Sequence, residues 1–138
     1  MKRGPILHPE LARAIASLGH GDALAVADAG LPIPSGVERI DLAYAPGKPP
    51  FLDVLEAVLA EMEVERAALA TEAKTLAPPA FFQALHGRLM ALPKVARRGV
   101  ELVSHEELKR LTGQARAVVR TGEFTPYANV VLFSGVVF

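Results

Sequence analysis

One short run constrains the fold of this chain more than any other feature of its sequence. Ala23–Ala27 is entirely apolar and lies between two acidic residues, Asp22 and Asp28. A continuous apolar run of this length is typical of a strand that is buried on both faces of a sheet. Because such strands are covered by helices on either side, the run points to an α/β domain.

Helical patterns alternate with further strand-like runs. Pro9 suits the first turn of a helix, and Ser104 with Glu107 forms a capping-box pattern in which Ser104 caps the helix and Glu107 reaches back. We expect helices over Pro9–Leu18, from Phe51 to Met62, from Pro78 onward and after Ser104, and strands over Ala23–Ala27, Arg39–Ala45, Arg66–Thr71, Val100–Val103, Ala117–Val119 and Val130–Phe133. This alternation predicts a single α/β domain over residues 1–138, with a largely parallel central sheet flanked by helices.

Composition excludes several classes of function. Fifteen Lys and Arg residues balance fifteen Asp and Glu residues, so we expect no nucleic-acid partner. The chain has no cysteine, which removes disulfides and thiolate catalysis, and its four histidines lack the spacing of a metal site. No signal peptide or membrane span is visible, so we expect a soluble, cytoplasmic protein.

Polar residues in apolar or glycine-rich settings are the candidate site residues. His20 lies between two glycines, Asp28 follows the buried strand, His105 falls in the first turn of a predicted helix, and Gly122–Asn129 is a polar loop between two strands. Ligands of open α/β sheets bind at the carboxyl ends of the strands. Each feature also has an ordinary structural explanation: turn chemistry for His20 and Asp28, surface exposure for His105, and chain reversal for the loop.

Several blocks of sequence are more specific than these patterns. They are Leu18-Gly19-His20-Gly21-Asp22, Asp28-Ala29-Gly30-Leu31-Pro32-Ile33-Pro34, Arg39-Ile40-Asp41-Leu42-Ala43, Ser104-His105-Glu106-Glu107 and the ending from Arg120 to Phe138. In this order, across nearly the whole chain, they strongly resemble the D-ribose pyranase family. L-fucose mutarotases belong to the same superfamily. Two segments favour the ribose branch: Ala29–Pro34, which typically differs in the mutarotases, and Tyr127-Ala128-Asn129, which reads Tyr-Gly-Asn in the mutarotases.

The resemblance implies a function and a set of site residues. It implies an isomerase that interconverts the pyranose and furanose forms of D-ribose by general acid/base ring opening and reclosure, which would supply furanose for ribose catabolism without a cofactor or metal. It also implies that His20 is the proton donor and that Asp28, His105, Tyr127 and Asn129 bind the sugar. Whether Asp28 orients His20 or accepts a sugar hydroxyl stays open. The alternatives are an L-fucose-type mutarotase and a non-catalytic sugar-binding accessory protein.

The predicted strand itself suggests how subunits cooperate. If Ala23–Ala27 is extended, His20 and Asp28 lie at its opposite ends, and at about 3.3 Å per residue their separation approaches 25 Å. One ribose cannot span that distance, so we expect each active site to be shared between subunits unless the Gly19-His20-Gly21 turn folds back sharply. The family resemblance separately implies a homo-oligomer, a decamer of two pentameric rings.

Overall fold

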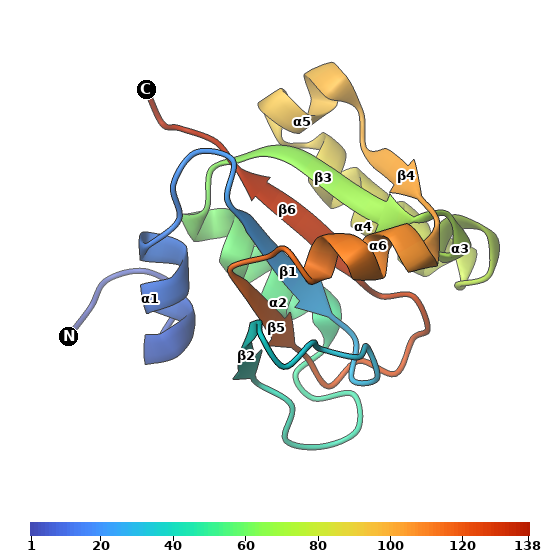
Figure 1. Ribbon diagram of the computed structural model, residues 1–138, viewed down its shortest axis with the longest axis horizontal. Helices are drawn as coiled ribbons and strands as arrows, with labels where there is room; N and C mark the ends of the chain where they lie inside the picture. Colours follow the sequence, from blue (N-terminus) through green and yellow to red (C-terminus); the bar gives the residue numbers. More distant parts are fainter.

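The computed structural model describes all residues 1–138 and is built on one six-stranded sheet (Figure 1). The strands are β1 (Ala23–Ala27), β2 (Glu38–Asp41), β3 (Val64–Ala70), β4 (Glu101–Val103), β5 (Ala117–Arg120) and β6 (Val130–Ser134). Their order across the sheet is β2-β5-β1-β6-β3-β4. Only β6 runs against its neighbours, β1 and β3, and the other pairings are parallel. The prediction of a largely parallel sheet is therefore confirmed.

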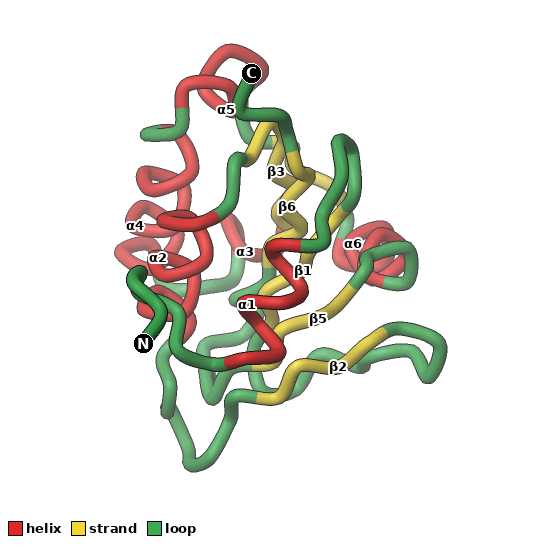
Figure 2. The backbone as a smooth tube through the Cα atoms, turned by 90° about the vertical axis from the view of Figure 1, so that its left-hand side faces the viewer, coloured by secondary structure: helices red, strands yellow, loops and turns green.

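Helices cover both faces of this sheet. They are α1 (Pro9–Ala16), α2 (Phe51–Glu61), α3 (Thr71–Thr75), α4 (Pro79–Met90), α5 (Pro93–Arg98) and α6 (His105–Thr112). Figure 2 shows α2 and α4 on one side of the strands and α6 on the other. None of the helices has the length and apolar character needed to cross a bilayer.

The central strand β1 divides the core into two layers. All five of its residues are buried, as the apolar run predicts. Leu24 and Val26 belong to the larger cluster of buried side chains, which includes Phe51 from α2. Ala25 belongs to a smaller cluster on the opposite face, together with Leu108 from α6. This two-sided burial fixes the position of both ends of β1: Asp28 follows its carboxyl end directly, and His20 lies three residues before its first residue.

Most expected elements are present, with three local differences. The strand expected over Arg39–Ala45 ends at Asp41, whose carboxylate accepts a hydrogen bond from the Ala43 amide and so turns the chain. The short helices α3 and α5 were not predicted, because each is too short to show an apolar period. Half of the capping box is formed: Ser104 accepts from the Glu107 amide, but the Glu107 carboxylate pairs with Arg110 instead of reaching back.

Candidate functional site

A cavity of about 610 Å³ lies at the carboxyl ends of β1 and β5. The loops that follow these two strands meet here, where the Ala29 amide donates a hydrogen bond to the Glu123 carbonyl (Figure 1). Six polar or charged side chains line the cavity: Asp28, Arg120, His105, Glu123, Thr125 and Tyr127. This edge is where open α/β sheets bind their ligands, as the position of Asp28 predicts.

Asp28 is held in place by a reciprocal pair of hydrogen bonds with Asn129. The Asp28 amide donates to Asn129 Oδ1 over 2.9 Å, and Asn129 Nδ2 donates to Asp28 Oδ2 over 3.0 Å. The other carboxylate oxygen, Oδ1, accepts from the Gly30 amide. Asn129 is only 1% exposed and lies beneath Asp28. Because each carboxylate oxygen of Asp28 accepts one hydrogen bond, the carboxylate is held in a fixed orientation at the cavity wall.

His105 and Tyr127 form the aromatic part of the cavity wall. Their rings meet edge to face, with centroids 5.1 Å apart. His105 lines the cavity, and its Nδ1 is buried without a hydrogen-bond partner. The His105 amide, at the start of α6, donates to Glu72 of α3 over 2.9 Å. Tyr127 has a φ of 62°, a strained value for a non-glycine residue of the kind that gathers at functional sites.

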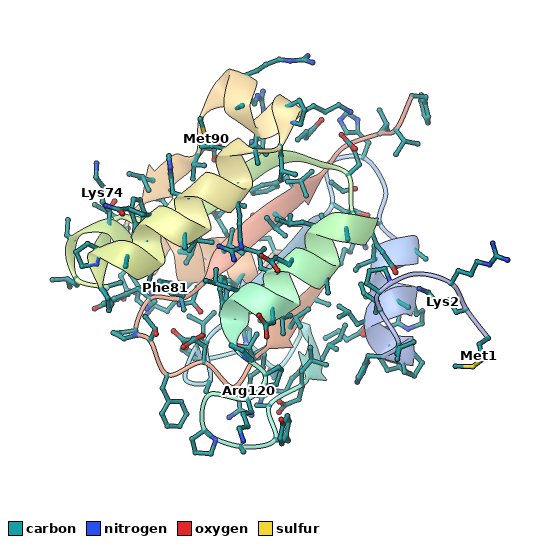
Figure 3. The ribbon with its side chains drawn as sticks, turned by 180° about the vertical axis from the view of Figure 1, so that it is seen from behind. Met1, Lys2, Lys74, Phe81, Met90 and Arg120 are labelled. Carbon is teal, nitrogen blue, oxygen red and sulfur yellow. The ribbon has the colours of Figure 1, made fainter.

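Arg120 fixes the loop after β1 against the sheet. Its Nε donates to the Ala29 carbonyl over 3.0 Å, while one terminal nitrogen lies 3.1 Å from both carboxylate oxygens of Asp41. Figure 3 labels Arg120 at this end of the molecule. Arg120 is not among the predicted site residues, although the reason for choosing Asp28, a polar residue at the carboxyl end of a strand, applies equally to it.

Glu123 fixes the loop after β5 in the same way. One carboxylate oxygen accepts the Phe51 amide at the start of α2 over 3.0 Å, and the other accepts the Thr125 hydroxyl over 3.0 Å. The residue also lines the cavity. Glu123 belongs to the polar loop Gly122–Asn129, but the sequence carries no signal that its carboxylate caps a distant helix.

His20 lies at the other end of β1, in the turn that leads into this strand. Its Nε2 lies 3.0 and 3.1 Å from the two carboxylate oxygens of Glu65, and its side chain is 60% exposed. Asp22 stabilises the turn, since it accepts the Gly19 amide and pairs with Arg116. The Gly19 amide, followed by the Arg116 guanidinium, lowers the pKa of the Asp22 carboxyl.

The structure thus brings together four of the five predicted site residues and leaves one apart. Asp28, His105 and Tyr127 line the cavity, and Asn129 supports Asp28 from below. His20 is separated from them by β1, whose five extended residues alone span about 17 Å. Within the chain, Asp28 bonds to Gly30 and Asn129 and not to His20. No group of three or more His, Asp or Glu side chains is arranged to hold a metal ion.

Known proteins resemble this chain along its whole length. The model of the RbsD / FucU transport protein family matches residues 1–137. Proteins named D-ribose pyranase from Variovorax paradoxus and Paracidovorax citrulli are 57% and 59% identical, with all of both chains covered. The structure of Bacillus subtilis RbsD complexed with D-ribose is 44% identical, with a TM-score of 0.89 over all of both chains. A fucose mutarotase from Streptococcus pneumoniae, solved with L-fucose, shares the fold over all of both chains at 22% identity and a TM-score of 0.83. The chain therefore belongs to the RbsD / FucU transport protein family.

Proposed function

We propose that this chain is an isomerase that interconverts the pyranose and furanose forms of D-ribose. The observation that carries the proposal is full-length identity of 57% and 59% to proteins named D-ribose pyranase. The cavity at the carboxyl end of β1 gives the proposal a chemical basis, since its side chains offer hydrogen-bond donors and acceptors for a polyhydroxylated ligand.

The reaction needs only proton transfers. The ring opens when the anomeric hydroxyl loses a proton and the ring oxygen gains one, and reclosure on another hydroxyl gives the second ring form. A positioned general acid or base accelerates such a step by about 10²–10⁴-fold. We assign that role to His20, as the family resemblance implies, because an imidazole can both accept and donate a proton.

The remaining residues bind and orient the sugar in this proposal. The Asp28 carboxylate is suited to accept a hydrogen bond from a sugar hydroxyl, because the Asn129 and Gly30 donors already fix both of its oxygens. The His105 ring and the Tyr127 hydroxyl supply further contacts across the cavity. Asn129 is assigned to the sugar site through its control of Asp28, with a direct sugar contact as the family resemblance implies.

We further propose that His20 serves the cavity of a neighbouring subunit, in a homo-oligomer of two pentameric rings. Two observations support a subunit contact at the His20 end. His20 is exposed and lies far from its own cavity. Val137 and Phe138, which are 86% and 98% exposed, line the same hollow as His20, and exposed apolar patches are typical of protein interfaces. A role in ribose catabolism would place the protein in the cytoplasm. A chain without cysteine suits this reducing compartment.

Saturation-transfer NMR tests the proposed reaction because it observes exchange between the ring forms directly. We expect the protein to accelerate pyranose–furanose exchange of D-ribose without any added cofactor. The His20→Ala variant should fold normally and lose about 10²–10⁴-fold of the rate. Exchange that stays at the buffer value while L-fucose anomerisation accelerates would assign the chain to the mutarotase branch. Ribose binding without faster exchange would instead indicate an accessory protein.

A further inference from the structure

Glu65, the hydrogen-bond partner of His20, has no role in the reaction proposed above. Both oxygens of the Glu65 carboxylate lie within hydrogen-bond distance of His20 Nε2, at 3.0 and 3.1 Å. We propose that Glu65 is the positioning residue for His20: it fixes the tautomer and orientation of the imidazole so that Nδ1 is the nitrogen that exchanges protons with the sugar. The role of Glu65 in catalysis rests on the proposed function, whereas its effect on the His20 tautomer does not.

Glu65 reaches His20 because of a bulge in β3. In the antiparallel pairing with β6, Val64 lies opposite Ser134, but Arg66 lies opposite Phe133, so Glu65 is an extra residue in its strand. A bulge of this kind bends the strand and redirects a side chain, and bulges are frequent beside active sites. A regular ladder would have placed Glu65 opposite Phe133. The bulge therefore gives Glu65 a position that ordinary strand geometry does not.

The end of β6, which separates β1 from β3, leaves room for the contact. The Gly21 amide donates to the Ser134 carbonyl, which ties the His20 turn to this strand end. The next residue is Gly135, where a Cβ atom would lie 3.2 Å from the Cβ of Glu65 and 3.6 Å from its Oε2. Gly135 thus allows the Glu65 side chain to pass over the strand end toward His20.

The residue after the bulge anchors this part of β3. The Arg66 guanidinium donates two hydrogen bonds to Glu101 on β4, and it lies 4.3 Å from the centre of the Phe133 ring. The hydrogen bonds to the Glu101 carboxylate raise the pKa of Arg66, so the guanidinium stays charged. With Arg66 fixed on both neighbouring strands, the backbone that carries Glu65 has little freedom to move away from His20.

Other charged groups surround His20 without bonding to its ring. Lys94, Arg97 and Arg98 of α5 share one hollow with His20 and Glu65, while Glu61 and Glu63 share a second hollow with His20. Lys94 is paired with Glu63, and Glu61 with Lys2. Glu65 is the only side chain that forms a hydrogen bond with the imidazole.

The chemistry of the pair follows from what a carboxylate can do. An ionised carboxylate only accepts hydrogen bonds, so its partner nitrogen, Nε2, must carry a proton. In the neutral ring Nδ1 is then the basic nitrogen, and in the protonated ring the Nδ1 proton is the one free to leave. A carboxylate that holds a catalytic histidine in one tautomer is a recurrent device in acid–base catalysis.

Three variants separate this role from a structural one. Glu65→Gln has nearly the same size but offers an amide that can donate to Nε2, while Glu65→Asp keeps the carboxylate. Glu63→Gln is the control, because it removes a neighbouring charge that does not touch the ring. His20 is exposed and Glu65 is partly exposed, so the loss of this pair should change stability little, which denaturation by urea can verify.

Nitrogen-15 NMR of the His20 ring and ribose-exchange kinetics give independent readouts. In the wild type and in Glu63→Gln we expect the Nε2–H tautomer and full exchange. In Glu65→Gln we expect a shift toward Nδ1–H, with kcat reduced at least about tenfold and KM unchanged. Glu65→Asp should restore the tautomer and part of kcat.

Distinct results would contradict the two proposals. An unchanged tautomer and an unchanged kcat in Glu65→Gln overturn the inference about Glu65. An aspartate variant no better than the glutamine variant does the same, because the carboxylate would then not be the active feature. A wild type that does not accelerate ribose exchange refutes the proposed function, while the tautomer comparison still decides whether Glu65 positions His20.

Discussion

His105 illustrates how one residue can be tied both to its helix and to the cavity. Its amide is held by Glu72, and its ring lies against Tyr127 with Nδ1 buried. We expect His105→Ala to leave the fold intact and to weaken ribose binding by about 1–3 kcal/mol, because hydrogen-bonding groups of the bound sugar would lose their partner. That range corresponds to a roughly 5- to 150-fold rise in the ribose Kd, measurable by calorimetry.

His86→Ala is the matched control for this substitution. His86 stacks on Phe82 on α4 and does not line the cavity, so its loss should leave the ribose Kd at the wild-type value. Equal affinity of the His105→Ala and wild-type proteins would remove His105 from the sugar site.

At the scale of single residues, the sequence predicted the cavity better than it predicted the surroundings of His20. Asp28 could be placed because a polar residue after a buried strand lies at the ligand-binding edge of an α/β sheet. Glu65 could not be placed. It is 45 residues from His20 in the chain, and its contact depends on a bulge that has no signature in the sequence of β3.

At the scale of secondary-structure elements, one glycine ties the loop after β5 to the loop before α2. Gly122 donates to the Pro49 carbonyl and accepts from the Gly47 amide. A Cβ atom on Gly122 would overlap the Lys48 carbonyl oxygen, a backbone atom that cannot move away alone. We expect Gly122→Ala to destabilise the protein by about 1–3 kcal/mol through overpacking, measured by urea denaturation.

The same substitution should also affect the cavity, because Gly122 directly precedes Glu123, which lines the cavity. Displacement of this loop should weaken ribose binding as well as stability. Gly36→Ala provides the comparison, since a Cβ atom there meets no atom within 4 Å. If Gly122→Ala matched Gly36→Ala in stability and ribose affinity, the two loops would not be coupled as the contacts indicate.

One element that the sequence did not predict holds a residue of the cavity wall in place. α3 is only five residues long, yet its Glu72 holds the start of α6 and therefore the position of His105. Longer elements were predicted because an apolar period over three or more turns, or a buried five-residue run, identifies them. A single helical turn is stabilised by its neighbours in space, and that information is absent from local sequence.

At the scale of the whole molecule, the two ends of β1 present complementary halves of the proposed machinery. The cavity with Asp28 lies at the carboxyl end, and the His20–Glu65 pair lies at the amino end. In a ring each subunit can offer one end to each neighbour, because such a heterologous contact repeats until it closes. The proposed assembly would therefore bring into one site the two groups that a single chain holds apart.

This arrangement predicts that two inactive variants can restore one another. His20→Ala and Asp28→Asn should each be inactive alone, since every site of either oligomer lacks one group. When equal amounts are dissociated and reassembled together, about a quarter of the sites should be intact, because each position is intact in half of the subunits at random mixing. Ribose exchange measured by saturation-transfer NMR should recover toward that fraction, and distinguishable tags on the two variants would verify that they share oligomers. Two variants mixed without dissociation serve as the control and should stay inactive. If verified mixed oligomers show no recovery, His20 and Asp28 do not meet across a subunit boundary, and catalysis must proceed within one chain with a different acid–base group.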